Sequence, residues 1–106
     1  MVRVTGPLDI QHSSEFLEEL RPLCDHPRVV VVDLRSADYV DSSGVRALMQ
    51  LDERLSATKG ELRLVIQPES RVARVLTLLR LIEQLRVYPS PAEAWATHGG
   101  LAPTAA

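Results

Sequence analysis

The chain has 106 residues, of which 45% are hydrophobic and 25% charged, and its formal net charge is -2. This length suits a single domain, and the composition is that of an ordinary globular protein. The weak negative charge, together with only one Trp, two Tyr and one Phe, argues against nucleic acid or an anionic membrane as a partner.

Cysteine content and sequence patterning exclude several further classes. The only cysteine, Cys24, cannot form an internal disulfide, and the three histidines have no ligand-like spacing around it, so we expect a structural Cys24 and no zinc site. No apolar run approaches the roughly 20 residues of a membrane span. Signal-peptide and Walker-type phosphate-loop patterns are also missing. We therefore expect a cytoplasmic protein that holds no cofactor.

The first quarter of the chain predicts a short strand and a helix. Residues 1–5 alternate apolar and polar side chains and are followed by a Gly-Pro pair that should end the strand. Residues 9–24 carry leucines and a phenylalanine at helical spacing, with glutamates on the opposite side. Because Pro22 cannot donate a backbone hydrogen bond, this helix should kink or end near Arg21.

A buried strand and a second helix flank a polar loop. Val29 to Val32, with Leu34, form the continuous β-branched run that is typical of a strand covered on both faces. The loop at residues 39–44 then leads into a helical pattern that lasts to about Ala57. A strand, a loop and a helix N-terminus in this order leave free backbone N–H groups that favour an anion.

The polar residues Asp41, Ser42 and Ser43 of this loop have two interpretations. Aspartate and serine are preferred immediately before a helix because their side-chain oxygens accept hydrogen bonds from unpaired backbone N–H groups. The alternative interpretation of the same hydroxyl-rich corner is a functional site. Residue types alone leave both interpretations open.

The second helix has two apolar stripes when its residues are placed at about 100° intervals. The first contains Gly44 and three leucines and should face the core. The second contains Ser42, Val45 and Met49, bordered by Arg46, whereas Ser43 points away. An apolar patch with a charged rim is typical of a partner-binding surface. Alternatively, another element of the fold covers this side, or the apolar residues are isolated on the surface.

The rest of the chain continues to alternate strands and helices, which predicts the α/β class. Lys59 and Gly60 should end the second helix. In the third helix, Leu79 should point inward with the other apolar residues. The remaining predicted elements are a strand at 62–66, a helix at 70–79, a strand at 86–88, a helix from 90 to about 98, and a disordered tail at 101–106.

Five segments resemble the STAS domain of bacterial anti-sigma factor antagonists, and together they span nearly the whole chain. They are Thr5-Gly6-Pro7-Leu8-Asp9, residues 29–34, Tyr39-Val40-Asp41-Ser42-Ser43-Gly44-Val45, residues 60–66 and residues 68–79. The resemblance implies one α/β domain over residues 1–100, with a mixed sheet and about four helices chiefly on one face. Members of the family usually have another strand before residues 1–5, so here the first family strand should be short or missing. A second copy of the chain could pair with the uncovered edge.

The resemblance also implies a function, that of a binding module that is itself a kinase substrate. An unphosphorylated antagonist binds an anti-sigma factor serine kinase and releases it after phosphorylation at the serine matching Ser42, and a serine phosphatase reverses the modification. The expected partner-binding residues are Asp9, Asp41, Ser42, Ser43, Gly44, Val45, Arg46 and Met49. A non-switching STAS subunit that braces a transporter or signalling assembly is the main alternative. A serine hydrolase is disfavoured because neither the spacing of the histidines nor a Gly-x-Ser-x-Gly motif points to a catalytic base for the serine. We therefore expect no enzyme activity.

Overall fold

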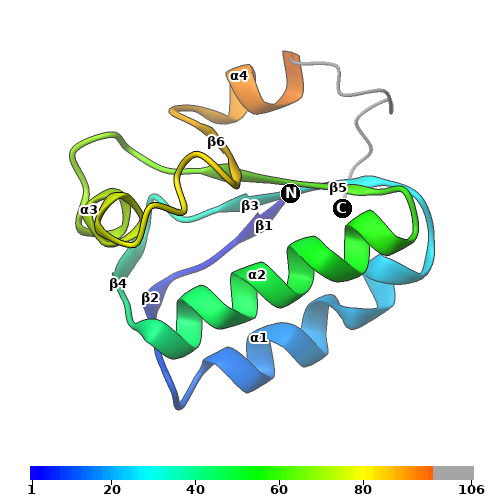
Figure 1. Ribbon diagram of the computed structural model, residues 1–106, viewed down its shortest axis with the longest axis horizontal. Coiled ribbons are helices and arrows are strands. Elements are labelled where there is room, and N and C mark those ends of the chain that lie inside the picture. The colour runs from blue at the N-terminus through cyan, green and yellow to red at the C-terminus, as the bar shows by residue number, and fades with distance from the viewer. Residues whose placement is uncertain (97–106) are drawn as a thin grey trace.

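A four-stranded sheet with the strand order β1-β3-β5-β6 forms the centre of the molecule (Figure 1). The computed structural model describes residues 1–96. From one edge to the other, the strands are β1 (Val2–Arg3), β3 (Val29–Asp33), β5 (Glu61–Val65) and β6 (Arg86–Tyr88). All three ladders between them are parallel, because a helical connection returns the chain to the same end of the sheet each time. The α/β class is confirmed, whereas the expected mixed pairing is wrong.

Strand β3 is the central strand that its sequence predicts. It pairs with β1 on one side and β5 on the other, and all five of its residues are buried. Val30 and Val32 face the main core, whereas Val29 and Val31 belong to a smaller cluster on the opposite face. The continuous apolar run therefore reflects burial on both faces of the sheet.

Two further strands form a separate ribbon that the sequence analysis did not anticipate. Strand β2 (Gly6–Leu8) pairs in parallel with β4 (Ala37–Val40). We expected the first strand to fill residues 1–5 and end at Gly6, but β1 is shorter and Gly6 begins a new strand with a positive φ of 75°. Glycine adopts this conformation without a steric penalty, so the chain can bend here and continue. Among the described residues, no strand pairs with the outer edge of β1.

Helices cover both faces of the sheet, and two of them lie on the same face. Figure 1 shows α1 (Ser13–Leu20) and α2 (Ser42–Ala57) side by side below the sheet, while α4 (Pro91–Ala96) lies above it. A 3-10 helix, η1 (Arg21–Asp25), continues from α1. The predicted end near Arg21 is confirmed, but α1 begins at Ser13 rather than at Asp9. The buried free thiol of Cys24 lies in η1.

The ends of α2 and of α3 (Arg71–Leu78) each depart from the expected pattern. After α2 the left-handed residue is Lys59, with φ 63°, rather than Gly60. Gly60 is required for another reason, because a Cβ there would lie 2.8 Å from the carbonyl oxygen of Arg28. At the C-cap of α3, the inward position predicted for Leu79 is wrong, since that side chain is 50% exposed.

The predicted start of the last helix is confirmed by its cap. The Ser90 hydroxyl accepts a hydrogen bond from the backbone N–H of Glu93, at the start of α4. The predicted end of this helix near His98, the domain limit at residue 100 and the tail at 101–106 all lie outside the described residues.

Candidate functional site

Asp41 joins the first turn of α2 to the loop that precedes α1. It is the N-cap of α2, and its Oδ1 accepts a hydrogen bond from the backbone N–H of Gly44 at 3.0 Å. Its Oδ2 accepts a second hydrogen bond, from the backbone N–H of Ile10 at 3.2 Å. One carboxylate therefore caps the helix and also holds together two loops that are far apart in the sequence.

Gly44 allows α2 to lie against β2 more closely than any other residue would. A Cβ at this position would lie 2.1 Å from the carbonyl oxygen of Leu8 and 3.1 Å from the Leu8 Cγ. The neighbouring backbone N–H of Asp41 donates to the same carbonyl oxygen at 3.4 Å. Glycine therefore sets the position of the first turn of α2, and with it the position of both serines.

Asp9 organises the turn before α1 rather than the first turn of that helix. Its Oδ1 accepts hydrogen bonds from the backbone N–H groups of Gln11 and His12, and its contact with His12 Nδ1 measures 2.6 Å. The hydrogen bond from the His12 side chain, with help from these backbone donors, lowers the pKa of the Asp9 carboxyl. Asp9 thus remains ionised and fixes the loop that Asp41 contacts through Ile10.

Ser42 occupies the first helical position of α2 and carries its hydroxyl on the surface. Its side chain is exposed and forms no hydrogen bond with a described residue. The backbone N–H groups of Ser42 and Ser43 also lack protein acceptors within residues 1–96, as expected for the first turn of a helix. An anion at this position would therefore find free donors and the positive end of the helix dipole.

Ser43 faces a different part of the surface from the open solvent around Ser42. Ser43 is half-buried and, with Arg46, lines a hollow of ≈ 360 Å³ between α1 and α2. Ile10, which is 73% exposed, lies at the rim of the same hollow. Sequence analysis did not single out Ile10, although an isolated apolar residue within a polar turn was a signal that could have drawn attention to it.

The apolar stripe predicted beside Ser42 is not a surface patch. Val45 is only 6% exposed and belongs to the main core, and Met49 is half-buried against that core. The expectation that Val45 contributes an exposed docking contact is therefore wrong, because the fold itself covers this side of α2. The exposed guanidinium of Arg46 fits the expected charged rim. Contacts of Met49 and Arg46 with a partner remain predictions.

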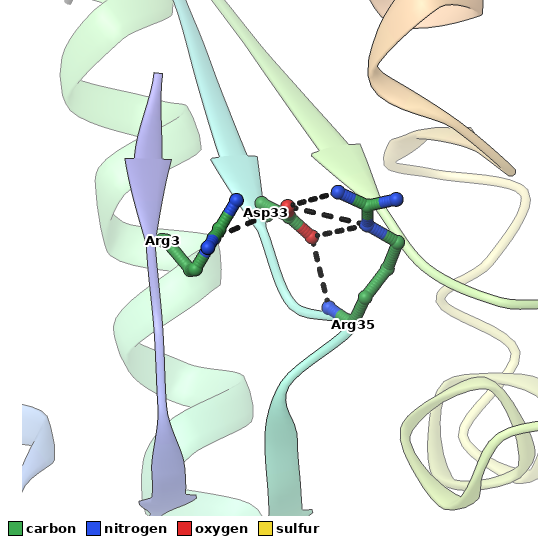
Figure 2. A network of polar contacts seen from close by, with 3 residues as sticks. All are labelled: Arg3, Asp33 and Arg35. Atoms are coloured by element: carbon green, nitrogen blue, oxygen red, sulfur yellow. Dashed lines mark hydrogen bonds and ion pairs between the residues drawn. The ribbon is translucent and has the colours of Figure 1, made fainter.

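A buried aspartate fixes the connection that leads from β3 to the site. The Asp33 carboxylate accepts hydrogen bonds from the backbone N–H and the guanidinium of Arg35, and Arg3 approaches from β1 at 3.9 Å (Figure 2). Its hydrogen bond with the Arg35 side chain lowers the pKa of Asp33. This network restrains the chain just before β4, which ends one residue before Asp41.

The sequence also matches a known domain family over most of its length. The model of the STAS domain aligns with residues 1–94. The chain belongs to the STAS domain family.

Solved structures of other proteins share this fold at low sequence identity. An anti-sigma factor antagonist from Mycobacterium paratuberculosis is 24% identical and has a TM-score of 0.76. The match covers 89% of this chain and 80% of that one. A sulfate transporter family protein from Wolinella succinogenes is 22% identical, with a TM-score of 0.72, covering 89% and 79%. The anti-sigma factor antagonist SpoIIAA in its unphosphorylated form is 16% identical, with a TM-score of 0.65, covering 86% and 79%. At these identities the likeness concerns the fold.

Within residues 1–96, none of the helices combines the length and the apolarity needed to cross a bilayer.

Proposed function

We propose that this STAS domain is an anti-sigma factor antagonist whose partner binding is controlled by phosphorylation of Ser42. In the unphosphorylated state it binds an anti-sigma factor serine kinase through the loop at Asp9, the cap at Asp41 and the first turns of α2. Phosphorylation ends this binding and a serine phosphatase restores it. The setting that we propose is the bacterial cytoplasm, with no nucleic acid or membrane as a partner.

The observation that carries the proposal is the geometry of Ser42. Its hydroxyl is exposed, has no hydrogen-bond partner among residues 1–96, and lies on a turn held from two sides by Asp41 and Gly44. A kinase supplies nucleotide, magnesium and the catalytic base, so its substrate needs only such an accessible hydroxyl. Neither Ser42 nor Ser43 is hydrogen-bonded to a histidine in the described part of the chain, which disfavours a serine hydrolase.

A phosphate at Ser42 would be tolerated by the fold but not by the partner. It adds about -1.5 to -2 charges to a chain whose formal net charge is -2. The free N–H groups of the first turn of α2 stabilise such a charge. Burying it against a partner that offers no matching cation is unfavourable, so binding is lost without a large change of shape.

Binding of purified anti-sigma factor kinases from the same genome to three variants tests this proposal. Ser42→Ala should bind whether or not ATP is present, and Ser42→Asp should bind weakly while its thermal unfolding matches that of the wild type. Ser43→Ala is the matched control, because it removes the neighbouring hydroxyl; it should still bind without ATP and be released with ATP. Equal ATP-dependent release of Ser42→Ala and wild type would contradict the proposal.

The alternative is a non-switching STAS subunit that braces a larger complex. It is favoured by the similarity of the fold to the Wolinella sulfate transporter family protein, which is comparable to the similarity to the antagonists. In such a subunit Asp41 and Ser42 would serve only to cap α2. Ser42→Asp would then leave its complex intact, whereas the partner switch predicts dissociation.

A further inference from the structure

The C-terminal end of α3 exposes two consecutive leucines. Leu78 is 82% exposed and Leu79 is 50% exposed, and Leu78 has the largest exposed fraction of the large apolar side chains in residues 1–96. The other face of the helix is buried through Val72 and Leu76. Single exposed leucines are common on protein surfaces, but adjacent ones form a patch that can contribute to binding.

Leu78 lines a hollow that adjoins a second, more apolar one. The first, of ≈ 280 Å³, is lined by Pro68, Ala73, Arg74, Thr77 and Leu78. The second, of ≈ 260 Å³, shares Pro68 and Ala73 with the first and extends over further apolar residues, namely Ile66, Ile82, Val87, Tyr88 and Pro89. Leu78 therefore stands beside an apolar depression that is large enough to receive individual side chains.

Positive charge surrounds the same part of the molecule. Arg71, Arg74 and Arg80 are exposed, and none of them forms an ion pair with another described residue. No acidic residue occurs between residues 70 and 82. This local excess contrasts with the formal net charge of -2 for the whole chain. The α3 surface, defined as Arg71, Arg74, Leu78, Leu79 and Arg80, is thus apolar with a cationic rim.

Arg80 occupies a backbone position that glycine adopts more easily. Its φ is 57°, and it lies in a Schellman motif in which the N–H of Arg80 donates to Thr77 and the N–H of Leu81 donates to Leu76. A cation at the end of a helix also interacts favourably with the helix dipole. Lys59 has the same position after α2, with φ 63°. The C-terminal end of α2, which Lys59 follows, lies at the opposite end of the molecule from α3 (Figure 1), so Lys59 provides a matched control for Arg80.

We propose that the α3 surface binds an acidic amphipathic segment of a partner protein. Carboxylates of that segment pair with Arg71, Arg74 and Arg80, while its apolar side chains cover Leu78 and enter the adjoining hollows. Separate hollows suit individual side chains of a peptide better than a continuous lipid surface. The surface does not include the Asp9, Asp41 or Ser42 corner, and this binding does not depend on phosphorylation.

Fluorescence anisotropy with a labelled amphipathic peptide of leucine and glutamate tests this inference. Leu78→Asp and Arg74→Glu, both at exposed positions, should keep the thermal unfolding of the wild type and weaken peptide binding about tenfold or more. Arg80→Gly should weaken peptide binding, whereas Lys59→Gly should not, although each variant replaces a basic residue in the left-handed backbone conformation by glycine. Backbone NMR shifts caused by the peptide should map to α3 and the segment after it.

Several outcomes would overturn the inference. They include no binding at about 1 mM peptide, equal binding of a peptide in which lysine replaces glutamate, and equal effects of Arg80→Gly and Lys59→Gly. Vesicles of phosphatidylcholine and phosphatidylserine provide a competing probe. If these vesicles bind the wild type and lose binding in Leu78→Asp while the peptide does not bind, the surface recognises anionic lipid instead.

Discussion

Replacing Gly44 by alanine sets two physical effects of opposite sign against each other. Alanine is favoured over glycine inside a helix by about 1 kcal/mol, so α2 taken alone would be stabilised. The new Cβ would, however, lie 2.1 Å from the carbonyl oxygen of Leu8, and that oxygen belongs to the backbone of β2 and cannot simply rotate away. Relief requires α2 to move from β2, which stretches the hydrogen bond between Asp41 and the N–H of Ile10.

We expect the clash to dominate and to lower the free energy of unfolding by about 3 kcal/mol, at the upper end of overpacking effects. For a domain of this size, that loss corresponds to a fall of roughly 10–20 °C in melting temperature. Thermal unfolding followed by circular dichroism measures it. Gly6→Ala is the control, because a Cβ there meets no atom within 4 Å and only the positive φ opposes it, so its loss should be about 1–2 kcal/mol. A Gly44→Ala protein as stable as the wild type, or more stable, would refute the close-contact argument.

Three further predictions concern stability. Asp41→Ala removes a helix cap and should cost about 1–2 kcal/mol, and hydrogen exchange at the N–H of Ile10 should accelerate; unchanged exchange at Ile10 would show that this bridge does not form in solution. Since Arg35 lowers the pKa of folded Asp33, ionised Asp33 stabilises the fold above its unfolded pKa of about 3.9, and this contribution is lost as pH falls through the lower folded pKa. Urea titrations between about pH 5 and pH 2 should therefore show that the free energy of unfolding depends less steeply on pH in Asp33→Asn than in the wild type. An equally steep dependence in both proteins would contradict this role of Asp33. Leu51→Glu should unfold the domain by burying a charge, whereas Met49→Glu, at a half-buried position, should be milder; equal losses of melting temperature would place Met49 in the core.

Apolar patterning predicted the elements that bury the most surface. The run Val29 to Val32 and the core leucines of α2 are recognisable in sequence because their periodicity reflects which faces are covered. Pro22 likewise marks the end of α1, since an imino acid cannot continue the hydrogen-bond pattern. The ribbon of β2 and β4 escaped prediction because short segments rich in glycine, proline and aspartate carry little strand signal.

Residues whose environment depends on distant parts of the chain could not be predicted. Arg63 in β5 is completely buried, where it pairs with Glu61 and donates to the carbonyl oxygen of Ala94 in α4, and nothing in its residue type indicates this burial. In the site, the cap at Asp41 was predictable from local chemistry, but its bridge to Ile10 was not. Val45 was misassigned for the same reason, because helical spacing gives the direction of a side chain but not what packs against it.

The proposal that Ser42 is the switch is tested most directly by mapping the phosphate. The wild type, Ser42→Ala and Ser43→Ala would each be incubated with ATP and a purified anti-sigma factor kinase that binds the unphosphorylated chain, and then analysed by peptide mass spectrometry. We predict one phosphate on Ser42 in the wild type and in Ser43→Ala, none in Ser42→Ala, and loss of kinase binding in proportion to the modified fraction. A phosphate on Ser43, or no modification while a transporter or scaffold co-purifies with the chain, would contradict the switch and favour the structural subunit.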